Sequence, residues 1–147
     1  MSDIKAHPII QGYIGWNQFG ILLGMDFEIP EKGKVVYRLK VEGKHLATPR
    51  AAHGGVQAAL MDATLGVAAL SNVCEENRVV STVSLMINYL SPALLGDEMT
   101  ATATVLKQGK NLAFVQGEIH NQNGKLLATA NATMNAYPVD KLLMAND

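Results

Sequence analysis

The sequence predicts one α+β domain in which an antiparallel sheet of five to six strands wraps around one long central helix. Residues 51–74 form a long stretch with a single formal charge, and segments of alternating polar and apolar residues stand on both sides of it. The turns between the later segments are short, which favours antiparallel pairing. The chain has 147 residues, of which 48% are hydrophobic and 17% charged, so residues 1–147 suffice for one core and intrinsic disorder is excluded.

The part of the chain before the helix is expected to contain a short helical or irregular segment and two strands. Residues 10–21 (IQGYIGWNQFGI) favour the short helix. Residues 34–41 alternate polar and apolar side chains after the turn formed by residues 31–33, and this alternation predicts a strand. A shorter strand near residues 22–29 is expected to pair with it.

The weakly charged stretch is expected to form a buried helix. Pro49 breaks the chain, and His53-Gly54-Gly55 begins a helix that should run to about Val73. The length of this stretch raises the possibility of a membrane span. Polar Gln57 and charged Asp62 lie within it, and it has no flanking aromatic anchors, so a buried helix of a soluble protein is the better interpretation.

Four strands follow, and each shows an alternation of period two. They are expected at residues 79–90, 99–107, 112–120 and 126–137. Residues 121–124 (NQNG) predict a hairpin turn with Gly124 at a position of positive φ. In the first of these strands the alternation places Thr82, Ser84, Met86 and Asn88 on one face.

The resulting order is two strands, one long helix and four strands. Consecutive strands with short turns form an antiparallel sheet, and a helix that is apolar nearly all round must be covered on most of its surface. A curled sheet that surrounds a central helix, the hotdog arrangement, satisfies both requirements.

Composition excludes several classes of function. Twelve Lys and Arg against thirteen Asp and Glu give a net charge of −1, which argues against a nucleic-acid partner. The single cysteine, Cys74, cannot form an internal disulfide or a thiolate zinc site. The four histidines are not at metal-ligand spacing, so we expect no metal. Residues 1–8 show no signal peptide, which predicts a cytoplasmic protein without a membrane partner.

Asp62 is the most informative residue of the helix. An acidic side chain within an uncharged helix is costly to bury unless it is paired or used. One interpretation is an Asp that hydrogen-bonds nearby backbone or sits at an interface. The interpretation we favour is a carboxylate in apolar surroundings that acts as a general base or nucleophile. Small residues one turn away, such as Ala58 and Gly66, leave space beside it.

The start of the helix supplies a second candidate group. Its first backbone N–H groups are free, and the positive end of the helix dipole lies behind them, which suits a developing oxyanion. Gly54 and Asp62 are eight residues apart, which corresponds to about 12 Å of helix rise. The two groups of one chain therefore cannot reach one carbonyl. A shared site requires a twofold dimer with antiparallel helices.

His53-Gly54-Gly55, Leu60-x-Asp62 and Gly66 together resemble the PaaI-like (phenylacetate-degradation type) branch of hotdog acyl-CoA thioesterases. Residues 88–93 (NYLSPA) and 105–113 (VLKQGKNLA) resemble the same family, and the resemblance covers about residues 35–136. It implies hydrolysis of an acyl-CoA or aryl-acyl-CoA thioester. Coenzyme A is then part of the substrate, and no other cofactor is expected.

The resemblance also implies roles for individual residues. Asp62 would activate water or attack the carbonyl, and the Gly54 N–H would polarise the thioester oxygen. His53 would orient the loop before the helix, and Thr82 would help to hold the attacking water. Contacts to coenzyme A are implied for Thr48, Arg50, Gly55, Val83, Lys107 and Lys110.

The sequence departs from the family at one position and leaves several alternatives open. Family members commonly carry Asn six residues before the His, where this chain has Ala47. Either Thr48 replaces that donor, or the oxyanion site depends on backbone N–H alone. A non-catalytic acyl-CoA-binding protein and a hotdog dehydratase or hydratase are the alternative functions.

The separation of Gly54 and Asp62 along the helix also predicts an assembly of subunits. We expect a homodimer with shared active sites that pairs into a dimer of dimers. The acyl group stays open, because the pocket depth is expected to depend on how Trp16, Phe19 and Met86 meet across subunits.

Overall fold

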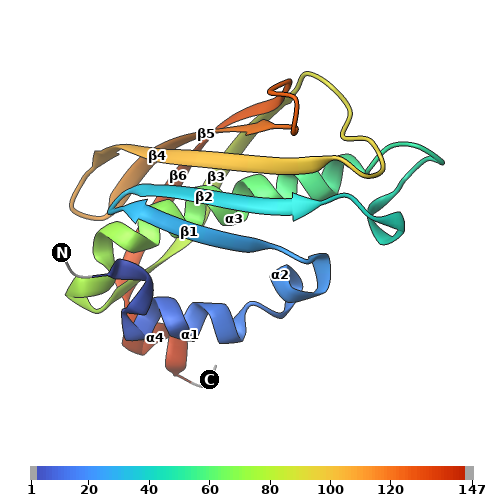
Figure 1. The fold of residues 1–147 in the computed structure, drawn as a ribbon. Coiled ribbons are helices and arrows are strands. Elements are labelled where there is room, and N and C mark those ends of the chain that lie inside the picture. The colour runs from blue at the N-terminus through green and yellow to red at the C-terminus, as the bar shows by residue number, and fades with distance from the viewer. Residues whose placement is uncertain (1–2, 145–147) are drawn as a thin grey trace.

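A six-stranded antiparallel sheet curls around helix α3 (Gly54–Val73) in the computed structural model, which describes residues 3–144 (Figure 1). The strand order is β1-β2-β4-β5-β6-β3. The strands are β1 (Asp26–Glu31), β2 (Lys34–Lys40), β3 (Arg78–Tyr89), β4 (Glu98–Gln108), β5 (Leu112–His120) and β6 (Leu126–Pro138). The predicted hotdog fold is confirmed. Strand β3 pairs only with β6 within the described chain, so it forms one edge of the sheet.

The N-terminal segment forms two helices where one was predicted. Helix α1 (Pro8–Trp16) ends at Asn17, and helix α2 (Gln18–Leu23) begins there. The Asn17 side chain accepts a hydrogen bond from the Gly20 N–H at 3.0 Å, so it caps α2. Gly24, with φ of 80°, then ends α2, and the strand expected near residues 22–29 begins only at Asp26.

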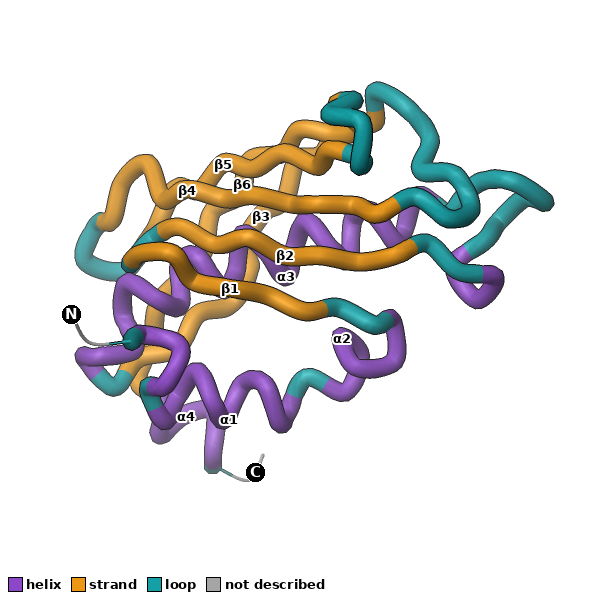
Figure 2. The backbone as a smooth tube through the Cα atoms, viewed as in Figure 1, coloured by secondary structure: helices purple, strands orange, loops and turns teal. Residues whose placement is uncertain are grey.

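A short C-terminal helix, α4 (Val139–Leu143), follows β6 and was not predicted. Figure 2 shows α1 and α4 close together below β1 and away from the upper strands of the sheet. Side chains from both helices line one cavity beside α3, which confirms that they are neighbours. The two ends of the chain thus cover part of α3 that the sheet leaves open.

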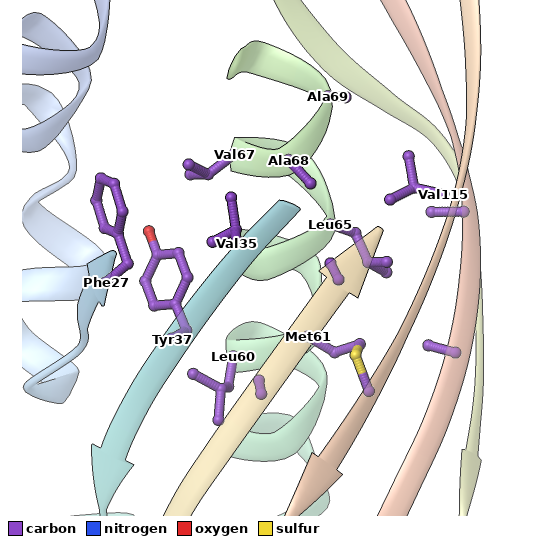
Figure 3. Close-up of a cluster of buried hydrophobic side chains, with 14 of the residues drawn as sticks. Phe27, Val35, Tyr37, Leu60, Met61, Leu65, Val67, Ala68, Ala69 and Val115 are labelled. Carbon is purple, nitrogen blue, oxygen red and sulfur yellow. The ribbon is translucent and has the colours of Figure 1, made fainter. Parts of the chain in front are cut away.

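The core lies between α3 and the concave face of the sheet. Leu60, Met61 and Leu65 are fully buried. In Figure 3 the side chains of Met61 and Leu65 point toward the strands, whereas Val67 points toward the N-terminal helices. Phe27 packs on Tyr37 on that second side, with ring centroids 4.9 Å apart. Helix α3 is therefore buried on two faces, as its apolar composition requires.

Helix α3 and the turn after it (residues 54–76) are long and apolar enough to cross a membrane by length and composition alone. Of the most apolar window, 67% is buried inside the fold. The core helix of a soluble protein has the same properties, which agrees with the expected buried helix.

A β-bulge in β3 corrects the predicted alternation of that strand. Thr82 pairs with Met134 and Ser84 with Thr133, so Val83 is an extra residue. The bulge reverses the alternation, because two residues of one strand face a single residue of the other. Thr82 therefore lies on the α3 side together with the residues that follow at 85 and 87, and not with Ser84 as the alternation predicted.

The approach of β5 to α3 depends on a glycine. A Cβ at Gly117 would lie 2.8 Å from the Thr102 carbonyl oxygen and 3.1 Å from the Met61 Sδ. We predict that Gly117→Ala lowers the free energy of unfolding by about 2 kcal/mol, as overpacking of a core does. Denaturant titration measures this. Gly15→Ala is the matched control, because a Cβ at Gly15 meets no atom within 4 Å. Equal stability of the two variants would contradict the prediction.

Candidate active site

Asp62 and Thr82 form the centre of the candidate site. The Thr82 hydroxyl donates a hydrogen bond to Asp62 Oδ1 over 2.7 Å. Asp62 projects from the middle of α3 and is partly exposed. Within residues 3–144 no hydrogen bond is found to its other oxygen, Oδ2. The pair therefore fixes the carboxylate through one oxygen and leaves the second available to a bound molecule.

A cavity of about 320 Å³ opens beside this pair. Asp62, Ala63 and Gly66 of α3 form one wall, and Thr82 lies at its edge. The rest of the lining is mostly apolar and comes from α1, the end of α3, the start of β3 and the C-terminal segment. Trp16 lines this cavity within a single chain, whereas Phe19 and Met86 do not.

Tyr13 is a residue of the cavity that the sequence analysis missed. Its hydroxyl lies 3.2 Å from the Tyr37 hydroxyl and accepts a hydrogen bond from the Asn17 side chain at 3.0 Å. Burial raises the pKa of Tyr13, and the negative charge of Asp62 raises it further. Tyr13 is therefore a neutral phenol, held in place, that shapes the wall of the cavity. Tyr13 lies four residues after Ile9 and three before Trp16, so the three side chains share one face of α1. This spacing could have identified Tyr13 from the sequence.

The start of α3 presents one free backbone donor. His53 is the N-cap, and its Nδ1 accepts a hydrogen bond from the Gly55 N–H at 2.8 Å. The Val56 N–H donates to the His53 carbonyl at 2.9 Å. For Gly54 no acceptor of its N–H is found among residues 3–144. Of the predicted oxyanion groups, the Gly54 N–H is thus free and the Gly55 N–H is occupied.

Two further residues, both missed from the sequence, hold Gly54 and its cap in place. The Tyr89 hydroxyl donates to the Gly54 carbonyl at 3.1 Å. The His53 N–H donates to the carbonyl of buried His45 at 2.8 Å. The His45 ring accepts from the Glu42 N–H at Nδ1 and lies 2.8 Å from the Leu23 carbonyl through Nε2. Only the Nε2–H tautomer satisfies both contacts, so His45 ties the loop to the end of α2.

The loop before α3 holds Ala47, Thr48 and Arg50. The Ala47 N–H donates to the Ala51 carbonyl at 3.0 Å, so it is not free. The Thr48 hydroxyl accepts hydrogen bonds from the backbone N–H groups of Arg50 and Ala51, at 3.3 and 2.9 Å. Thr48 therefore stabilises its own turn as an acceptor. Among the described residues its O–H is still free to donate, so the Thr48 hydroxyl and the Gly54 N–H both stay candidates for the oxyanion donor.

The remaining residues expected to contact coenzyme A do not come together in one chain. Lys107 and Lys110 flank the β4–β5 turn, where Gln108 meets Asn72 at the far end of α3. Arg50 lies at the other end of that helix, and 20 residues of α-helix span about 30 Å. Val83 is 61% exposed on the edge strand.

No group of three His, Cys, Asp or Glu side chains placed to hold a metal ion occurs among the residues that the structure describes. The groups that the structure places for chemistry include the Asp62 carboxylate, the Thr82 hydroxyl and the free N–H of Gly54.

A curled sheet wrapped around one central helix defines the hotdog fold. A carboxylate and a free backbone N–H on that helix are groups that a hydrolase can use. The family model described as the thioesterase superfamily matches residues 51–128. Human acyl-coenzyme A thioesterase 13 is 39% identical over 103 residues, which cover 69% of this chain and 71% of the relative. The chain belongs to the thioesterase superfamily, and the predicted thioester hydrolase is confirmed.

Solved structures agree with this assignment. The PaaI protein of the Escherichia coli phenylacetic acid degradation operon superposes with a TM-score of 0.80 at 26% identity, over 86% of this chain and 89% of that one. A hypothetical thioesterase protein of Streptococcus pneumoniae, solved with coenzyme A, superposes with a TM-score of 0.77 at 26% identity, over 86% of this chain and 97% of that one. The predicted resemblance to PaaI is confirmed by structure.

The hydrogen bond between Thr82 and Asp62 leads to a prediction. Thr82→Val removes the hydroxyl with little change of shape, and we expect turnover of a thioester substrate to fall about tenfold or more, the scale of a hydrogen bond to a charged group. Thr82→Ser keeps the hydroxyl and should stay within about threefold of the wild-type rate. Steady-state kinetics of both variants test this. Equal rates for Thr82→Val and Thr82→Ser would show that the hydroxyl does not act on Asp62 during the reaction.

Proposed function

We propose that the protein hydrolyses acyl-CoA thioesters to the free acid and coenzyme A, with Asp62 as the general base or nucleophile. The observation that carries this proposal is a carboxylate held by Thr82 through one oxygen, with the other oxygen open beside a mostly apolar cavity. The names of the relatives support the substrate class, since thioesterase 13 is named for acyl-coenzyme A.

The reaction follows from the available groups. Asp62 removes a proton from water that attacks the thioester carbon, or it attacks that carbon directly. Negative charge then develops on the carbonyl oxygen, which the Gly54 N–H at the positive end of α3 stabilises. The tetrahedral species collapses, the C–S bond breaks and coenzyme A leaves as a thiolate. Attack by water gives the free acid in this step, whereas direct attack by Asp62 leaves a mixed anhydride on its carboxylate, which a water molecule then hydrolyses to the free acid and the restored carboxylate. A thiol has a pKa near 8.5, so its departure needs no strong acid.

The two groups are expected to act from different subunits. Gly54 and Asp62 of one chain are separated by about 12 Å along α3. The edge strand β3 is unpaired on one side within the described residues. Next to it, a stripe of small residues on α3 around Asp62 is left partly exposed, namely Ala58, Ala59, Ala63 and Gly66. Such an edge favours pairing with a second copy. We infer a twofold homodimer in which β3 pairs with β3 and the α3 helices run antiparallel.

This dimer also accounts for the distribution of basic residues. An antiparallel arrangement brings the far end of α3 in one subunit close to the helix start in the other. Lys110 lies at that far end, where its carbonyl accepts a hydrogen bond from Arg78 at the start of β3. Lys107 and Lys110 of one subunit and Arg50 of the other then provide cations for the phosphates of coenzyme A. The dimer of dimers and the cytoplasmic location remain predictions.

The role of Asp62 is tested by Asp62→Asn. This change keeps the size of the side chain and an acceptor for Thr82, but it removes the base. We expect kcat on an acyl-CoA substrate to fall at least about 10²-fold, the scale of a lost general base. Circular dichroism and the unfolding midpoint serve as the control for folding. A folded Asp62→Asn protein with wild-type kcat would contradict the proposed mechanism.

A mixing experiment tests the shared site. Asp62→Asn and Gly54→Val should each be inactive. After subunit exchange about half of the dimers are mixed, and each mixed dimer contains one site with both residues intact. We therefore expect about a quarter of the wild-type activity per dimer to return. If mass spectrometry shows mixed dimers and activity stays absent, the two residues act within one chain.

A further inference from the structure

Gly66 lies one turn after Asp62 on α3, and both residues line the same cavity. Residues four apart on a helix share one face. A side chain at position 66 would therefore occupy the space next to the Asp62 carboxylate.

Packing within the chain does not require a glycine at this position. A Cβ at Gly66 would have one neighbour within 4 Å, the Met134 Cε at 4.0 Å, which is an ordinary contact. At Gly117, in contrast, backbone and core atoms stand too close for any side chain. Glycine inside a helix is less favourable than alanine. Gly66 thus destabilises helix α3 relative to alanine. Because glycine has no side chain, the cavity stays open at this position.

The chemistry of the cavity wall restricts what can occupy it. Apolar side chains predominate, among them Trp16, Val67, Leu70 and Val79. None of the lining residues is Lys, Arg or His, and Asp62 is the one charged group among them. A carboxylate inside this cavity would lose its hydration without gaining a cation, and Asp62 would repel it. The cavity therefore suits an uncharged apolar group.

Two of the closing walls lie outside the region that the family model matches. Trp16 comes from α1 and Leu142 from α4, whereas the match covers residues 51–128. The depth of the cavity is consequently set by the chain's own N-terminal and C-terminal helices.

We propose that this cavity, formed within one subunit, holds the acyl group of the substrate and that Gly66 is the specificity-determining residue that keeps it open. Uncharged apolar acyl groups enter, and acyl groups that end in a carboxylate are excluded. This inference rests on the proposed acyl-CoA hydrolysis.

The test compares wild type, Gly66→Ala and Gly66→Val on straight-chain acyl-CoA substrates from acetyl-CoA to palmitoyl-CoA. In Gly66→Val, kcat/KM for the longest acyl groups that the wild type accepts should fall at least about tenfold, because one methylene in an apolar pocket has an effect of that size. For acetyl-CoA, kcat/KM should fall less than for the longest acyl groups, so the ratio of the two values measures the shift in preference. Gly66→Ala should shift the preference in the same direction but by a smaller factor. If Gly66→Val does not fold, Gly66→Ala still tests the inference.

Gly15→Val is the matched control. Gly15 is also a helical glycine with no atom near its Cβ position, and it does not line the cavity. Its acyl preference should equal that of the wild type. Sedimentation velocity should show the same oligomeric state for all variants. The inference is overturned if the Gly66 variants lose activity equally on every substrate, keep the wild-type preference, or change the oligomeric state.

Charge selectivity is the second arm of the test. Succinyl-CoA and butyryl-CoA have acyl chains of equal length, and the wild type should prefer butyryl-CoA by at least about 100-fold in kcat/KM. Comparable values would contradict the inference. Failure of the proposed function looks different, because the wild type would then hydrolyse no acyl-CoA of the series. Hydrolysis with an unchanged preference in Gly66→Val contradicts only the role of Gly66 and the cavity.

Discussion

Burial of helix α3 is the constraint on which the rest of the structure depends. The helix carries one charged residue in its 20 positions, so nearly every face must be removed from water. The curled sheet covers one face, and the N-terminal and C-terminal helices cover part of another. What stays partly exposed is a stripe of small residues around Asp62, beside an unpaired strand edge. The carboxylate of the proposed mechanism therefore lies where a single chain leaves α3 uncovered.

The same helix determines how the site can be assembled. In the proposed mechanism its first free N–H and its carboxylate both act on the thioester, and the rise of an α-helix holds them about 12 Å apart. No change of side-chain rotamer closes that distance. A second copy with its helix reversed does, and it also brings cations to the side on which coenzyme A would lie. The proposed oxyanion donor and base would thus come from two subunits, while the proposed acyl cavity beside Asp62 belongs to one.

Much of the fold can be predicted from the sequence, because strands and the buried helix repeat with clear periods. The break at Asn17 and the bulge at Val83 could not be predicted in this way, since the first depends on a side-chain cap and the second on pairing with a distant strand. For the site, Asp62 is visible as a lone charge in an apolar helix. Its contact with Thr82 follows from the bulge, and the roles of Tyr13 and His45 follow from contacts between segments far apart in the sequence.

A shared site requires Gly54 of one subunit and Asp62 of the other to bind the same thioester. A crystal structure with a non-hydrolysable acyl-CoA analogue, in which a methylene replaces the thioester sulfur, tests it most directly. We expect a twofold dimer in which the analogue's carbonyl oxygen lies within hydrogen-bond distance of the Gly54 N–H of one subunit. The Asp62 carboxylate of the other subunit should lie beside the carbonyl carbon. A carbonyl bound by both residues of the same chain, or bound away from them, would show that the site is not shared in this way.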